Sequence, residues 1–134
     1  MNDNAVSGQE VVFSTTLADT VFSAVRDNAD GTYTATLKGT KSGTAKIKVT
    51  VNNAVLAVTE VSIKLTADSG NLDKGKSSLA AVPDTIVADG NTTSAITLTL
   101  RDVNNNPVAG QVALFSTTLK DTTFGTVTDN QDGT

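Results

Sequence analysis

Apolar and polar residues alternate one by one over most of the chain, which is the period of a strand buried on one face. Residues 44–51 are the clearest case, because Lys46, Lys48 and Thr50 alternate with small or apolar residues. The same period predicts strands at 9–17, 20–26, 32–38, 44–51 and 54–66, and again at 79–88, 95–103, 111–119 and 122–128. No window of helix length repeats apolar residues every three to four positions, so the pattern predicts an all-β chain.

The alternation also predicts which side chains face the interior. Phe13 and its later counterpart Phe115 are expected to be buried between two sheets, whereas Thr97 is expected on the outer face. The other residues expected inside are Val11, Thr15, Leu17, Phe22, Val25, Tyr33, Ala35, Leu37, Ala45, Ile47, Val49, Val51, Val55, Ala57, Thr59, Val61, Ile63, Leu65, Ile96, Leu98 and Leu100. Turn residues at 27–31, 52–53 and 89–91 separate the strands, and Pro83 interrupts 79–88 because proline cannot donate to a ladder.

One segment of the chain occurs twice. Shifted by 102 positions, residues 2–32 align with 104–134 without a gap, and 19 of the 31 positions are identical. The stretch Phe-Ser-Thr-Thr-Leu at 13–17 returns unchanged at 115–119. A period of about 100 residues is the size of one β-sandwich domain, so the chain is expected to hold roughly one and a third such units.

About seven short strands per period, with turns between them and no helix, predict an Ig-like β-sandwich. In the usual lettering the chain reads C-D-E-F-G over 1–66, a polar junction over 67–78, and A-B-C-D over 79–134. The chain is thus cut out of phase with the repeat, and we expect neither half to have all the strands of a sandwich.

Composition argues against several classes of function. His and Cys are absent, which removes thiol chemistry, structural zinc, Ser-His relays and histidine switches. The net charge of −4 argues against nucleic acid, whose recognition needs clustered basic residues. No apolar run reaches about 18 residues and no signal peptide is recognised, so no direct membrane insertion is expected. Met1 is interpreted as an initiator placed on a fragment.

Several segments together carry a family resemblance. They are Asp-Gly-Thr-Tyr at 30–33, Val-Ala-Asp-Gly at 87–90, Ile-Thr-Leu-Thr-Leu-Arg-Asp at 96–102, Asn-Pro-Val-Ala-Gly-Gln at 106–111 and Phe-Ser-Thr-Thr at 115–118. In this order and spacing they resemble the group 1 bacterial Ig-like domain, which recurs in tandem in invasin, intimin and related inverse autotransporter adhesins. In that family, a barrel in the outer membrane anchors a stalk of repeats that presents a terminal binding domain, often lectin-like.

The resemblance implies a structural stalk or spacer module of a bacterial cell-surface adhesin, supporting cell adhesion. Such a module would be extracellular, and a barrel outside this fragment would anchor it in the outer membrane. Its partners would be neighbouring Ig-like repeats or strand-exchanged copies of itself, with a host-cell receptor met through a tip domain that nothing here resembles. The alternative is an Ig-like module that itself binds a ligand on a host or neighbouring cell, which an exposed apolar patch would favour. A module borrowed by a phage or a secreted enzyme stays open as well.

We predict no catalytic, cofactor-binding or metal-binding residues, no cofactor and no enzyme activity. Two cation sites are weighed against turn chemistry. The loop 129–133, copied at 27–31, has Gly at its fifth position and no closing Glu, so a hairpin turn is favoured over a calcium loop. The second is a cluster of Asp68, Asp73 and Asp89 near the junction.

Three further features have plainer interpretations that we favour. Lys46, Lys48 and Lys64 are interpreted as solvated residues that protect a sheet edge, and a patch for an anionic ligand is the alternative. Tyr33 is interpreted as a core residue. The stretch Asn-Thr-Thr at 91–93 matches a glycosylation acceptor and is interpreted as a turn.

The strands that each half lacks are present in the other half. A complete set exists as 79–134 with 33–66, or as 79–103 with 2–66. Within one chain, the 12-residue junction would have to run back along the whole sandwich. Fully extended, it reaches about 40 Å, which is roughly the length of a sandwich, so it would be taut. We therefore favour strand exchange between chains over a permuted monomer.

Overall fold

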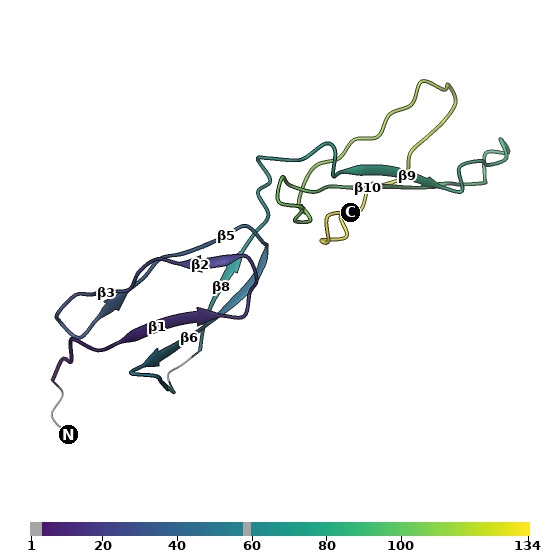
Figure 1. Cartoon of the computed structure of the whole chain (residues 1–134). Coiled ribbons are helices and arrows are strands. Elements are labelled where there is room, and N and C mark those ends of the chain that lie inside the picture. Colours follow the sequence, from purple (N-terminus) through teal and green to yellow (C-terminus); the bar gives the residue numbers. More distant parts are fainter. Residues whose placement is uncertain (1–3, 58–59) are drawn as a thin grey trace. The chain divides into compact units, whose positions relative to one another are not determined.

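The structure is a computed structural model that describes residues 4–57 and 60–134, so the expectations for residues 1–3 and Thr59 lie outside the described residues. The described residues form no helix, and their strands pair only in antiparallel ladders, which confirms the all-β prediction. The chain divides into two compact units, Met1–Thr66 (unit 1) and Ala67–Thr134 (unit 2). Figure 1 shows the strands of both.

Unit 1 is organised on one long central strand. Its strands, within the described residues, are β1 Val11–Thr15, β2 Thr20–Phe22, β3 Arg26–Asp27, β4 Tyr33–Thr34, β5 Leu37–Gly39, β6 Gly43–Val51, β7 Ala54–Val55 and β8 Val61–Leu65. The strand β6 pairs with β1 on one edge (Figure 1) and with β7 and β8 on the other. Two short ladders, β2 with β5 and β3 with β4, complete the unit.

The register of β1 on β6 follows the predicted alternation. Phe13 lies opposite Val49 and Thr15 lies opposite Ile47, and directly opposed residues share one face of a sheet. These four side chains are half-buried, whereas Ser14 and its partner Lys48 are exposed on the other face. The period-2 pattern therefore placed both strands correctly.

The turn between β6 and β7 is the predicted two-residue loop. Val51 pairs with Ala54, and Asn52 and Asn53 between them have φ of 50° and 63°. A two-residue hairpin with both central residues at positive φ is a type I′ turn, and asparagine tolerates that region better than most residues. The side chain of Asn52 also accepts a hydrogen bond from the backbone N–H of Glu10 at 3.1 Å.

The predicted continuous strand at 54–66 is wrong, because β7 and β8 pair with β6 in different registers. Five residues separate β7 from β8, whereas only Lys48 and Val49 separate their partners on β6. This slip of three residues reverses the side to which alternate side chains point. Val55 lies opposite Thr50 and is 77% exposed, not inside as predicted.

Unit 2 pairs far less of its backbone. Within it, β9 (Ser78–Val82) and β10 (Ala95–Thr99) form one antiparallel hairpin, and β9 ends directly before Pro83 as expected. The strands predicted at 111–119 and 122–128 do not form. In unit 1 the equivalent strands β1, β2 and β3 pair with β6, β5 and β4, respectively. The 134 residues contain no second copy of β4, β5 or β6 at the 102-residue spacing.

The repeated segment nevertheless keeps its local conformation in both units. The rings of Phe13 and Phe22 have centroids 6.1 Å apart at an interplanar angle of 29°, and those of Phe115 and Phe124 are 6.0 Å apart at 29°. The equivalent carboxylates also accept equivalent hydrogen bonds, because Asp27 accepts one from Gly8 N–H and Asp129 accepts one from Gly110 N–H, at 2.6 and 2.7 Å.

Neither unit buries a full sandwich core. Ala45 and Val108 are the buried apolar side chains among the described residues, at 0% and 2% exposure. Phe13 and Phe115 are only half-buried, so the prediction that both are buried between two sheets is wrong. Val61 and Ile63 lie on the predicted inner face, opposite Ile47 and Ala45, yet both are exposed. In both units, other side chains therefore cover these apolar faces only in part.

We predict that Phe13→Ala lowers the free energy of unfolding of unit 1 by about 2 kcal/mol, less than the roughly 3–5 kcal/mol of a fully buried Phe. Ser14→Ala, on the outer face of the same strand, is the matched control and is expected to cost less than about 1 kcal/mol. Tyr33 is the one Tyr of a chain without Trp, so tyrosine fluorescence during a urea melt of the full chain reports on unit 1. Equal midpoint shifts for the two variants would contradict the in/out assignment of β1.

Candidate functional site

The acidic residues considered for a cation are each engaged in their own turn. Asp73 accepts hydrogen bonds from the backbone N–H groups of Gly75 and Lys76 at 2.8 and 3.2 Å. Asp89 accepts from the N–H groups of Asn91 and Thr92 at 2.9 and 2.7 Å. Within residues 4–57 and 60–134, no group of three or more His, Cys, Asp or Glu side chains is placed to hold a metal ion. The structure therefore does not bring Asp68, Asp73 and Asp89 together as one site.

The loop at 27–31 is a hairpin turn, as favoured. Asp27 pairs with Tyr33 across it, and the N–H of Asn28 donates to the carbonyl of Thr32 at 3.0 Å. Asp30 accepts hydrogen bonds from the N–H and the hydroxyl of Thr32, which lower the pKa of its carboxyl. The copy at 129–133 repeats these hydrogen bonds, with Asn130 and Asp132 bonded to Thr134.

Three lysines lie on the outer face of the sheet in unit 1. Lys46 and Lys48 alternate along β6, and Lys64 lies opposite Thr44 on the neighbouring β8. All three are exposed, and Lys46 forms an ion pair with Glu60 at 3.1 Å. An exposed pair of this kind contributes at most about 1 kcal/mol, so this face has the character of a solvated surface.

Tyr33 ties the start of unit 1 to its sheet. The phenol oxygen accepts a hydrogen bond from Gln9 N–H at 3.1 Å and donates one to the carbonyl of Val6 at 3.2 Å. The ring is half-buried. Tyr33 is thus both a core residue, as interpreted, and a backbone clamp that sequence reasoning did not predict.

The most buried polar group was missed by sequence reasoning. Asp102 is 0% exposed and lies where the polar stretch 101–106 follows β10. Its Oδ1 accepts hydrogen bonds from the N–H groups of Asn104 and Asn106, at 2.9 and 2.8 Å. Its Oδ2 accepts from the N–H of Asp68 at 3.0 Å and from the side-chain amide of Asn106 at 2.9 Å. The signal in the sequence was an aspartate followed at alternate positions by asparagines, directly after an apolar strand.

These hydrogen bonds set the charge state of Asp102. Burial desolvates the carboxylate and by itself raises its pKa, but the four donors favour the charged form and together outweigh burial. The pKa of Asp102 is lowered from 3.8 to about 2. The carboxylate is therefore ionised over the whole physiological range and acts as a fixed acceptor, not as a proton-transfer group.

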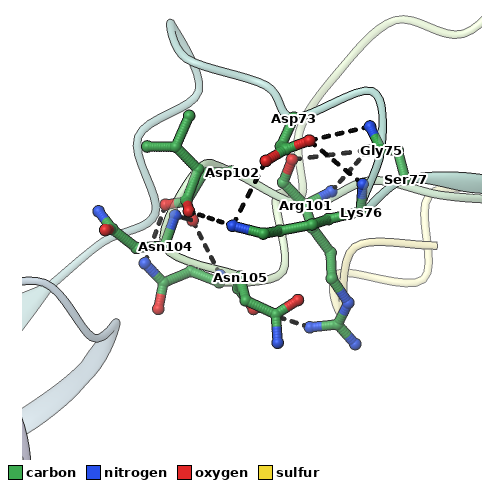
Figure 2. Close-up of polar contacts among 10 residues, drawn as sticks. Asp73, Gly75, Lys76, Ser77, Arg101, Asp102, Asn104 and Asn105 are labelled. Atoms are coloured by element: carbon green, nitrogen blue, oxygen red, sulfur yellow. Dashed lines mark hydrogen bonds and ion pairs between the residues drawn. The ribbon is translucent and has the colours of Figure 1, made fainter.

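Asp102 and its neighbours, shown in Figure 2, hold residues 68–77 against the end of β10. The N–H of Asp73 donates to the carbonyl of Arg101 at 2.8 Å, and the hydroxyl of Ser77 accepts from the N–H of Arg101 at 3.1 Å. Lys76 donates to the carbonyl of Val103 and lies 3.3 Å from the carboxylate of Asp73. We call residues 68–77 and 100–106 the aspartate hub. Residues 67–78, predicted as a junction, are thus part of unit 2.

Unit 2 also has an open groove of about 1470 Å³ between β10 and the segment 108–134, which forms no strand. Six apolar side chains that line the unit 2 groove are Ile96, Leu98, Val108, Phe115, Leu119 and Phe124. In the part of the chain that the structure describes, no helix is long and apolar enough to cross a membrane.

The aspartate hub predicts a specific pH dependence. Because the pKa of Asp102 is lower in the folded state, its contribution to stability is complete above about pH 4 and is lost as the pH falls toward about 2. Asp102→Asn replaces one acceptor oxygen with an NH₂ group that faces N–H donors. We therefore expect the free energy of unfolding of unit 2 to fall by at least about 2 kcal/mol at neutral pH. The difference from the unsubstituted chain should then shrink as the pH falls from about 4 to about 2.

Amide signals of Asn104 and Asn106 in two-dimensional NMR, followed through urea titrations at several pH values, measure this loss residue by residue. Asp84→Asn is the control, since that exposed carboxylate accepts a hydrogen bond only from its neighbour Thr85 among the hydrogen bonds described. A stability difference between Asp102→Asn and the unsubstituted chain that does not change with pH would contradict the assignment.

We also predict that calcium does not stabilise the chain. Thermal melts in chelator and in millimolar calcium, at matched ionic strength, should superimpose. A ligand at 100 times its dissociation constant would add about 2.7 kcal/mol, which is several degrees in a chain of this size. A rise of that order on adding calcium would revive the site at Asp68, Asp73 and Asp89.

Comparison with known proteins agrees with the fold. One solved structure, described as invasin, a bacterial integrin-binding protein, matches with a TM-score of 0.64 and 34% sequence identity over 76% of this chain. A second, InvD of Yersinia pseudotuberculosis, matches with a TM-score of 0.59 and 24% identity over 79% of this chain, and that likeness concerns the fold alone. The chain spans only 20% of the invasin chain and 34% of the InvD chain.

The family model described as invasin, domain 3, matches twice along the sequence. The matched residues are 1–68 and 73–134, which together cover nearly the whole chain. The resemblance to the invasin and intimin group is thereby confirmed, together with the Ig-like all-β class. The chain belongs to the invasin domain 3 family.

Proposed function

We propose that this chain is a spacer segment of a bacterial cell-surface adhesin, and that it separates a distal binding region from the cell. The proposal extends to location: the module would lie outside the cell, anchored by a membrane domain that is not among these 134 residues. Receptor contact would belong to another part of the parent protein. The integrin binding named for invasin is a property of that protein.

The observation that carries the proposal is how short the connection between the units is. The strand β8 ends at Leu65, and the N–H of Asp68 is already bonded to the buried carboxylate of Asp102. Only Thr66 and Ala67 lie between these two fixed points. A connection of two residues leaves no room for a long flexible coil linker, which is what a spacer built from successive modules needs.

The repetition of local structure supports the same function. The stacked Phe pairs and the hydrogen bonds of Asp27 and Asp129 recur at a spacing of 102 residues. A tandem array of one repeated module gains length without adding chemistry, which is the property that a spacer needs.

Exposed apolar side chains would favour the alternative, a module that binds a ligand itself. Unit 2 exposes Val112 and Leu114 at 93% and 92%. By the 102-residue offset they correspond to Glu10 and Val12, and Val12 is 49% exposed in unit 1 although it pairs with Thr50 of β6. The exposure therefore belongs to the outer face of the segment, and we favour the spacer on the short connection and the repeated local structure.

Distance measurements test the spacer directly. The chain has no Cys, so spin labels can be placed by Lys38→Cys in unit 1 and Thr97→Cys in unit 2, both at exposed positions. We expect a narrow distribution of label distances. Insertion of Gly-Gly-Ser after Thr66, which leaves the aspartate hub intact, should broaden it. An equally broad distribution in both chains would contradict the spacer.

A binding assay separates the two functions. Beads coated with the chain should adhere to cultured mammalian cells no better than beads coated with albumin, because a spacer contributes no receptor contact. Saturable adhesion that soluble chain competes away would overturn the spacer and support the ligand-binding alternative.

A further inference from the structure

The unit 2 groove is a sandwich interior that lacks its cover. Three equivalent pairs of apolar residues, Leu17 and Leu119, Phe22 and Phe124, and Val25 and Val127, are half-buried in unit 1 and exposed in unit 2. The exposed fractions in unit 2 are 70%, 42% and 46%. Because the local conformation is the same in both units, the difference comes from what packs against the segment.

Unit 1 identifies what that cover is. Phe13 lies opposite Val49 of β6, and Phe22 lies opposite Leu37 of β5. Gly43 opens β6 at φ of +151°, a backbone conformation that favours glycine, and an added Cβ there would lie 2.9 Å from the side chain of Leu17, so the two residues are closely packed. Residues 33–66, which include β5, β6 and β8, therefore carry the surface that fits Phe115, Leu119 and Phe124.

The charges of the two segments are complementary. Residues 33–66 contain five lysines and one glutamate, a net charge of +4. Residues 79–134 contain six aspartates against Arg101 and Lys120, a net charge of −4. Residues 2–32, which pair with 33–66 in unit 1, also carry −4, from four aspartates and Glu10 against Arg26. Residues 79–134 thus have the same net charge as 2–32, the segment with which 33–66 pairs in unit 1.

A second copy of the chain can supply 33–66 at little energetic cost. The donor gives up contacts with 2–32 and regains them from 104–134, which is identical at 19 of 31 positions. It gains in addition the apolar faces of β9 and β10, where Leu79 and Ile96 are exposed. The exchange therefore covers 104–134 in place of 2–32, and its net gain in burial comes from β9 and β10.

We propose that the unit 2 groove binds residues 33–66 of a second copy of this chain, so that two copies complete each other by strand exchange. The occupant is fixed by the register of unit 1: β6 of one copy pairs with residues 113–117 of the other, and β5 pairs with 122–124. This proposal does not rest on the spacer function, since it concerns how incomplete units close.

Cysteine trapping tests the register. Ser14 lies opposite Lys48 in unit 1, so the equivalent Ser116 should lie opposite Lys48 of the second copy. The chain has no Cys, so only introduced thiols can form disulfides. Ser116→Cys and Lys48→Cys chains, one lengthened by a tag, are mixed in urea, refolded together and mildly oxidised. We expect the mixed disulfide dimer to form.

The control mixture pairs Ser116→Cys with Thr97→Cys, an exposed position on β10 outside the proposed pairing. The Lys48→Cys mixture should give about tenfold more mixed dimer, which corresponds to about 1.4 kcal/mol of preference. Equal yields in the two mixtures would overturn the proposed register.

Light scattering across a dilution series tests the assembly without substitutions. We expect a mass of twice 13.7 kDa at high concentration, falling toward 13.7 kDa on dilution, with weaker association at high salt because the segments are oppositely charged. A mass of 13.7 kDa at every concentration would overturn the proposal. It would leave the spacer function untouched, since distance measurements within one chain test that separately.

Discussion

The antiparallel pairing of β1 with β6 holds unit 1 together, and most other features of the chain depend on whether that pairing is present. The strand β6 pairs with β1 on one side and with β8 on the other, and Ala45 of β6 is fully buried. Where the pairing is absent, in unit 2, the same Phe-Ser-Thr-Thr sequence is not a strand. A strand is stabilised by its partner, because its backbone groups need acceptors and donors that lie far away in sequence.

What does persist in unit 2 is the structure that needs no distant partner. The stacking of Phe115 on Phe124 and the turns at Asp129 and Asp132 recur because their groups lie within a few residues to about 20 residues of one another. The aspartate hub is the compensating feature of unit 2. A single ionised carboxylate, Asp102, collects four donors and so orders a polar segment that has no apolar core of its own.

The same distinction explains how much could be predicted from the sequence. The alternation of apolar and polar residues predicted β1 and β6 with the correct faces. The pair Asn52-Asn53 predicted the turn between β6 and β7. Both signals are local in the sequence. The slip between β7 and β8, which turned Val55 outward, could not be predicted, since the period of either strand alone is unbroken. The strands predicted at 111–119 and 122–128 do not form, because alternation along one segment does not show whether a partner strand is available to pair with it. Asp102 was missed as a site residue because a buried aspartate looks like any turn aspartate until its donors are placed.

Amide hydrogen exchange in 11–15 and 113–117 tests the central claim most directly, because the segments are nearly the same in sequence and differ in pairing. At concentrations where the chain is monomeric, the account predicts strong protection of Val11–Thr15 and little protection of 113–117, with protection of the second segment appearing as concentration rises. Equal protection of both segments in the monomer, or of neither, would contradict the claim that pairing with β6 makes this sequence a strand.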